Sequence, residues 1–184
     1  MSRRRLGVAL LIPSPAAVEI DGLRRALGDG ARTRIPPHVT LVPPVNVPEE
    51  SLGDALAVLR AAADRTPPLD IRIGPAATFH PVNPVVYLQV GGAVEGLAAL
   101  RERVLVPPLE RPITHAFVPH VTVADDMEPA RIPAAVAALA DYVVDVRVDT
   151  VHLLEEGRGR VWRPIAEVGL TRRWVPGQVK RTIG

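Results

Sequence analysis

Continuous apolar runs alternate along the chain with segments in which apolar residues follow helical spacing. Residues 6–12 are apolar throughout and end in prolines, which is typical of a buried strand. Residues 15–27 have apolar positions near helical spacing and are followed by glycines, which favours a helix. The same patterns predict, in order, strand 34–42, helix 48–64, strands 69–79 and 84–90, helix 94–105, strand 114–124, helix 132–142, and strands 143–154 and 161–170 around a hairpin turn at 155–159.

The order strand, helix, strand, helix, strand therefore occurs twice. This predicts an α+β fold made by internal duplication, with antiparallel-rich sheets and outer helices around a central cleft. We expect one two-lobed domain over residues 1–170, with lobes at about 1–80 and 84–170. A basic tail, residues 171–184, follows it and shows no periodicity.

The middle strand of each predicted repeat contains the same four residues. They are Pro37-His38-Val39-Thr40 in the first half and Pro119-His120-Val121-Thr122 in the second. Side chains at i and i+2 of a strand point to the same face, so each copy offers an imidazole beside a hydroxyl while the valine turns inward. Facing each other across the cleft, the two strands would form a four-residue site. The alternative is a pair of buried strands in which each histidine caps a polar network.

Composition narrows the chemistry that this site could perform. The chain has 184 residues, 47% of them hydrophobic, and it has no cysteine, which excludes disulfides and thiolate chemistry. Two histidines without a third histidine or a carboxylate at ligand spacing make a poor metal site, so neither a metal nor a cofactor is predicted.

Charge and hydropathy bear on partners and location. The net charge is only +2, so a polybasic nucleic-acid track is not expected. No apolar run is long enough to span a membrane, and prolines follow the first run at once, unlike a signal peptide. These features predict a cytoplasmic protein.

Two imidazoles on opposite sides of a phosphorus atom can take a proton from an attacking water and give one to the departing oxygen. Thr40 and Thr122 could then donate hydrogen bonds to the non-bridging phosphate oxygens. The residues leave open which histidine is the acid and which is the base.

Four further residues are candidates for substrate contacts. His115 would reach the site only if its strand began irregularly. Tyr87 or Trp162 could stack on a base, although core packing is the alternative for both. Arg163 could contact a phosphate. The remaining histidines, His80 and His152, are expected to be structural or on the surface.

The paired His-Val-Thr motifs in a duplicated α+β chain resemble the 2H phosphoesterase superfamily, in particular 2′-5′ RNA ligase-like proteins and cyclic phosphodiesterases. The resemblance covers roughly residues 6–170 and rests on residues 38–40 and 117–122. It implies two pseudo-symmetric lobes, a phosphodiester substrate, often a 2′,3′-cyclic phosphate, and no metal.

The chain departs from relatives that act on RNA ends. Those often carry Leu-Ala-Arg just after the second motif, where this chain has Val123-Ala124-Asp125-Asp126. An acidic pair there would repel a polyanion, which favours a smaller nucleotide or another phosphodiester.

We therefore predict a metal-independent phosphodiesterase acting on a 2′,3′-cyclic phosphate or a related nucleotide or RNA-end phosphodiester. The alternatives are a module that binds a nucleotide or RNA end without turnover, a 2′-5′ RNA ligase, and a hydrolase that uses the histidines as metal ligands. Oligomeric state and physiological substrate do not follow from the residues.

Overall fold

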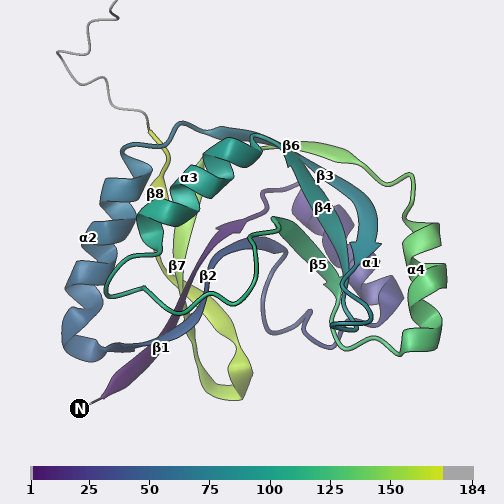
Figure 1. Ribbon diagram of the computed structural model, residues 1–184, viewed down its shortest axis with the longest axis horizontal. Coiled ribbons are helices and arrows are strands. Elements are labelled where there is room, and N and C mark those ends of the chain that lie inside the picture. The colour runs from purple at the N-terminus through teal and green to yellow at the C-terminus, as the bar shows by residue number, and fades with distance from the viewer. Residues whose placement is uncertain (1, 172–184) are drawn as a thin grey trace, which may run out of the picture.

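Two antiparallel four-stranded sheets with outer helices make up the computed structural model, which describes residues 2–171 (Figure 1). The strands are β1 (Arg3–Leu11), β2 (His38–Pro48), β3 (Leu69–Thr78), β4 (Val86–Gly92), β5 (His120–Ala124), β6 (Val144–Val148), β7 (Thr150–Glu156) and β8 (Trp162–Gly169). The helices are α1 (Ala16–Leu27), α2 (Leu52–Ala63), α3 (Val94–Val104) and α4 (Ile132–Ala138). The predicted α+β class is confirmed, while the predicted tail, apart from its first residue, lies outside the described residues.

Each sheet takes strands from both halves of the sequence. The first sheet has the order β2-β1-β7-β8, and the second has the order β5-β4-β3-β6. The predicted repeat of strands and helices is present. However, the last strand of each repeat joins the sheet built mainly from the other repeat: β3 pairs with β4, and β7 pairs with β1. The predicted lobe ranges 1–80 and 84–170 therefore do not coincide with the sheets. Backbone pairing decided this: β7 pairs with the distant β1, and β3 pairs both with its neighbour β4 and with the distant β6.

Two helices, α1 and α3, also pack against the sheet opposite to the one whose strands they connect. Helix α1 connects two strands of the first sheet but contacts β5 of the second, and α3 contacts β2 of the first. As a result α2 and α3 cover the first sheet, while α1 and α4 cover the second (Figure 1). Within residues 2–171, no helix is both long enough and apolar enough to cross a membrane.

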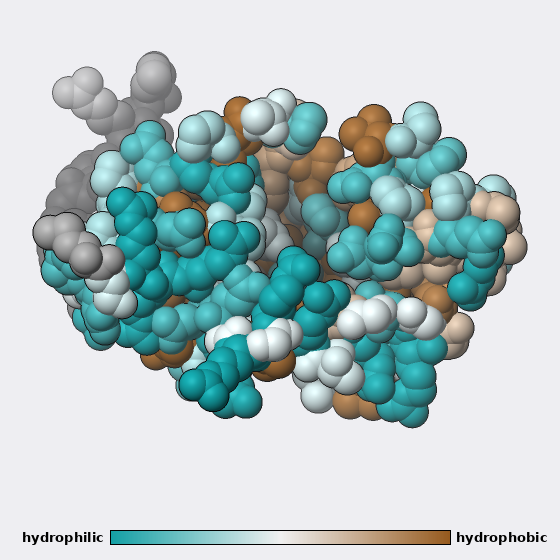
Figure 2. Space-filling model, turned by 90° about the horizontal axis from the view of Figure 1, so that it is seen from below, coloured by the Kyte–Doolittle hydropathy of each residue, from teal (hydrophilic) through white to brown (hydrophobic). Residues whose placement is uncertain are grey.

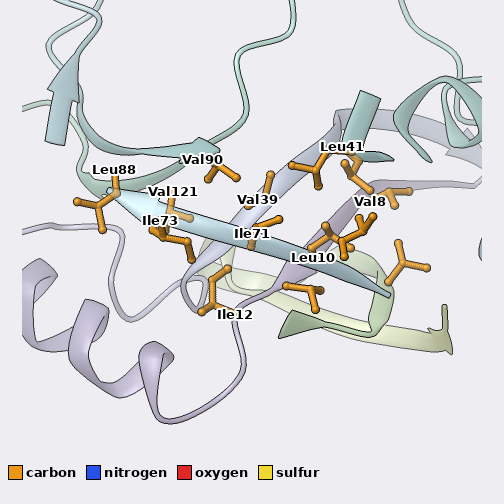
Figure 3. Packing of buried hydrophobic residues seen from close by; sticks show 14 of the residues in the cluster. Val8, Leu10, Ile12, Val39, Leu41, Ile71, Ile73, Leu88, Val90 and Val121 are labelled. Atoms are coloured by element: carbon orange, nitrogen blue, oxygen red, sulfur yellow. The ribbon is translucent and has the colours of Figure 1, made fainter. Parts of the chain in front are cut away.

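One continuous hydrophobic cluster joins the two sheets. Side chains of β1 and β2 lie beside those of β3, β4 and β5 (Figure 3). Val39 and Val121, the residues between histidine and threonine in each motif, have no exposed surface. Burial of both valines fixes the register of the two motif strands, because a slip of one residue would turn them out and the histidines in.

The first motif strand begins and ends later than predicted. The sequence predicted a strand over 34–42 closed by Pro43-Pro44, but β2 starts at His38 and continues to Pro48. It lies at the edge of its sheet and pairs only with β1, so the missing N–H groups of the prolines break little of the ladder. The two prolines fall where the register between β1 and β2 shifts.

Three other boundaries differ from the prediction. The second motif strand covers only His120–Ala124, and residues 105–119 form a long loop instead of its first half. The predicted strand 143–154 is two strands, β6 and β7, which separate at Asp149 and enter different sheets. The predicted helix 132–142 already ends at Ala138.

Candidate active site

The two motif histidines are held in the same way. The Nδ1 atom of His38 lies 2.8 Å from the carbonyl oxygen of Pro36, and the Nδ1 atom of His120 lies 2.7 Å from that of Val118. A carbonyl oxygen can only accept, so in each ring Nδ1 carries the hydrogen. Each Nε2 then carries a lone pair in the neutral ring and a hydrogen in the charged ring. Either histidine could therefore act as a base or as an acid.

Two cavities meet at Thr40. The smaller one, about 220 Å³, is lined by His38 and Thr40 together with residues that include Arg34, Asp125 and Trp162. The larger one, about 510 Å³, is lined by His120 and the same threonine, and by residues of the loop 105–119. The surface is hollowed near its middle, and hydrophobic residues show inside the recess (Figure 2). The edge strands β2 and β5 contact each other, and Thr40 shares one cavity with His38 and the other with His120.

Electrostatics favour the neutral form of both rings. The pKa of His38 is lowered from 6.5 to about 4, mainly by burial and to a smaller extent by the nearby charges of Arg24 and His120, against the opposing effect of the Pro36 carbonyl. Burial also lowers the pKa of His120, against the opposing effect of the Val118 carbonyl. The coupling between the two imidazoles means that they lie within range of each other's charge. At neutral pH, therefore, His38 is uncharged and available as a base.

Aromatic rings fix the orientation of His120. Its ring meets that of Phe79 edge to face, with centroids 5.1 Å apart, and that of Tyr87 at 5.2 Å. Phe79 and Tyr87 are themselves stacked at 4.2 Å. Tyr87 is 8% exposed and lines neither cavity, which favours the packing alternative over stacking on a base.

The other predicted contacts are divided between the two cavities. His115 is exposed on the loop before β5 and lines the larger cavity, in keeping with the irregular backbone that its involvement required. Trp162 lines the smaller cavity, where its ring lies close to Gly7. Arg163 lines neither, because it follows Trp162 on β8 and turns to the opposite, exposed face. Thr122 is partly exposed and also lines neither cavity.

Several cavity residues went unnoticed in the sequence. Phe79, Arg101, Arg111 and Phe117 line the larger cavity, and Arg160 lines the smaller one. They come from a strand end, a helix and loops. Phe117 alone belongs to the second motif stretch, residues 117–122, where no substrate contact was assigned to it. His80 and His152 line neither cavity beside Thr40, and His152 is buried on β7.

A buried ion pair braces the backbone on both sides of the site. Arg24 is 3% exposed, and its Nε donates to Asp29 Oδ2 at 2.7 Å while its Nη1 donates to the Ile35 carbonyl at 2.8 Å. Asp29 Oδ1 accepts from the backbone N–H groups of Ala31 and Asp125, at 3.0 and 3.4 Å. The pair thus connects the loop that leads into the first motif with the turn that follows the second.

Comparison with known proteins identifies the family. The profile of the 2′-5′ RNA ligase superfamily matches residues 12–160. A candidate phosphoesterase of Bacillus cytotoxicus is 31% identical over 160 residues, which is 86% of this chain and 92% of the relative. A similar protein of Bacillus pumilus is 33% identical over 155 residues, 83% and 90% of the two chains. The chain belongs to the 2′-5′ RNA ligase superfamily, which confirms its resemblance to the 2H phosphoesterases.

Solved structures share the two-lobed fold. Escherichia coli LigT crystallised with 3′-AMP superposes with a TM-score of 0.63 at 18% identity, over 93% of this chain and 100% of that chain. A Thermus thermophilus protein gives a TM-score of 0.57 at 22% identity, over 92% and 100%. At these identities the likeness extends to the fold alone.

Proposed function

We propose that the protein is a metal-independent phosphodiesterase that opens a 2′,3′-cyclic phosphate, or a related nucleotide or RNA-end phosphodiester, by paired histidine catalysis. The position of Thr40 carries this proposal, since it lines both cavities while His38 lines one and His120 the other. A phosphate bound at the threonine hydroxyl would have an imidazole on each side. An in-line displacement at phosphorus needs a base and an acid in that arrangement.

We assign the role of base to His38, because its pKa of about 4 keeps the ring neutral. Its neutral Nε2 takes a proton from water as the water oxygen attacks phosphorus. The bond from phosphorus to one ribose oxygen then breaks, and His120 Nε2–H protonates that oxygen to leave a phosphomonoester. His120 must be charged for this step, and a bound phosphate anion raises its pKa and favours that form. Thr40 and Thr122 are proposed to donate hydrogen bonds to the non-bridging oxygens.

Family membership and the neighbours' ligands agree with this class of substrate. Escherichia coli LigT has been crystallised with 3′-AMP and with ATP, so a protein of this fold accommodates nucleotides. Among residues 2–171, no three His, Asp or Glu side chains gather as metal ligands. The proposal therefore assigns the histidines to proton transfer.

Incubation with 2′,3′-cyclic AMP in the presence of a chelator, followed by chromatography of the products, tests the proposal. We expect the wild type to produce a single phosphomonoester, and His38→Ala and His120→Ala each to lower turnover by roughly 10²–10⁴-fold. His80→Ala is the matched control, because this histidine is exposed and lines neither cavity.

Three outcomes would overturn the proposal. Full activity in a folded His120→Ala variant would rule out the paired mechanism. Activity that a chelator abolishes and a divalent metal restores would favour the metal-dependent hydrolase. Tight nucleotide binding without any product would favour the binding module. Adding an oligonucleotide with a free 5′-hydroxyl tests the ligase alternative in the same assay, since joined product would then appear.

A further inference from the structure

Two guanidinium groups line the larger cavity without a carboxylate partner. Arg101 Nη1 donates to the Leu41 carbonyl at 2.9 Å, and Arg111 Nη1 donates to the Pro44 carbonyl at 2.6 Å. Both acceptors belong to β2, the strand of the first motif, and both are neutral. Each guanidinium has five N–H donors, so most of its hydrogen-bonding capacity and all of its charge remain available.

The surroundings leave these charges uncompensated. The described residues that line the larger cavity include no aspartate or glutamate, and neither arginine forms an ion pair anywhere in residues 2–171. Other arginines of the chain are paired, for example Arg4 with Glu155. An unpaired, partly buried cation in a concave site is a recognition group for an anion.

The smaller cavity is a poorer place for an anion. It is lined by Arg34 but also by the acidic Asp125, and another of its lining residues, Arg160, lies 3.6 Å from Glu156. Its volume of about 220 Å³ contrasts with about 510 Å³ on the other side of Thr40. Only the larger cavity falls within the range of roughly 300–1,000 Å³ that is usual for small-molecule sites.

The two guanidinium groups are already held in place. Arg101 lies over the ring of Phe117, with its Cζ atom 4.5 Å from the ring centroid, in addition to its bond to β2. Burial lowers the pKa of Arg101, which reflects partial removal from water rather than pairing with an acid. A group that is fixed before binding loses little conformational entropy when an anion arrives.

We propose that Arg101 and Arg111 form a subsite for a second phosphate of the substrate, separate from the phosphate that reacts beside Thr40. The substrate class is then a nucleotide with two phosphorylated positions, the reacting diester and a further phosphate on the same molecule. This inference rests on the proposed function, since the reacting phosphate is the one assigned to the histidines. It adds that the nucleoside, which stays bonded to phosphorus through its other ribose oxygen, extends into the cavity on the His120 side.

A pair of matched substrates tests the subsite. We expect the value of kcat/KM to be about 10- to 100-fold higher for adenosine 2′,3′-cyclic phosphate with a 5′-phosphate than for the same nucleotide without it, the effect of a charged hydrogen bond. In Arg111→Gln and Arg101→Gln this ratio should fall toward one. Arg60→Gln, which removes an equal charge from an exposed position on α2, should leave the ratio as in the wild type.

Binding gives a readout that does not depend on turnover. We expect adenosine 3′,5′-bisphosphate to bind more tightly than 3′-AMP in calorimetry, and the difference to shrink in Arg111→Gln but not in Arg60→Gln. If no cyclic nucleotide is turned over while this difference persists, the proposed function fails and the anion subsite stands. If both nucleotides bind equally, or if Arg111→Gln keeps the wild-type preference while folded, the subsite is overturned.

Discussion

The Nε of Arg24 and the Oδ2 of Asp29 form an ion pair 2.7 Å apart whose side chains are 3% and 0% exposed. Arg24 Nη1 donates to the Ile35 carbonyl, and the second oxygen, Asp29 Oδ1, accepts from the N–H groups of Ala31 and Asp125. The pair thus fixes the loop before His38 and the turn after β5, so the spacing between the two motif strands depends on residues outside both motifs.

Breaking this pair should destabilise the fold. Asp29→Ala leaves the Arg24 guanidinium buried without a partner, and we expect a loss of about 3–5 kcal/mol in the free energy of unfolding, measured with denaturant. Arg24→Met combined with Asp29→Leu should cost less than the sum of the single changes, because both charges are then gone. Asp145→Ala is the control, since its pair with Arg72 is exposed and should contribute little. Equal losses in Asp29→Ala and Asp145→Ala would contradict the assigned role.

Stability should also depend on pH through His38. Its pKa is about 4 in the folded protein and 6.5 ordinarily, so between these values the unfolded chain binds the extra proton. The stability linked to the neutral ring is therefore present above pH 6.5 and is lost as the pH falls toward 4, by at most about 3 kcal/mol. Denaturant titrations at several pH values should show a smaller loss in His38→Gln than in the wild type. Identical slopes would contradict the burial of His38.

The two motif threonines should differ in importance. Thr40 lines both cavities and Thr122 lines neither, although both occupy the same place in their motifs. We expect Thr40→Val to lower kcat/KM by about tenfold or more, through the loss of a hydrogen bond to a charged phosphate. Thr122→Val should have the smaller effect, and both should cost less than either histidine change. A larger loss in Thr122→Val would mean that the phosphate lies closer to β5 than Thr40 suggests.

Binding to long RNA should be weak and should depend little on salt. Asp125 and Asp126 are exposed beside the second motif, and Asp125 lines the smaller cavity next to His38. Few phosphates can then be neutralised, so the logarithm of affinity should fall gently with the logarithm of salt concentration. Fluorescence anisotropy of a labelled oligonucleotide measures this slope. A steep slope would reveal an RNA track elsewhere on the surface.

Some features of the site could be derived from the sequence alone. The period of a strand is two, so the fully buried Val39 and Val121 put each histidine and its threonine on the opposite face wherever the strands go. The repeated order of strands and helices likewise predicted a two-lobed α+β fold. These inferences depend on local geometry, which neighbouring residues determine among themselves.

Long-range pairing decided the rest. β7 joins the first sheet through hydrogen bonds with β1, far away in the sequence, and β3 joins the second sheet through its neighbour β4 and the distant β6. The local pattern is the same whichever sheet a strand joins. Arg101 and Arg111 line the site because helix α3 packs on β2 and the loop that follows α3 turns back along β2. There the two side chains donate hydrogen bonds to the carbonyls of Leu41 and Pro44. An isolated arginine carries no sign of such a position, since its meaning depends on which distant backbone atoms it reaches. The sequence therefore determined the two pairs of histidine and threonine that we propose to be catalytic, and tertiary packing decided which other side chains surround them.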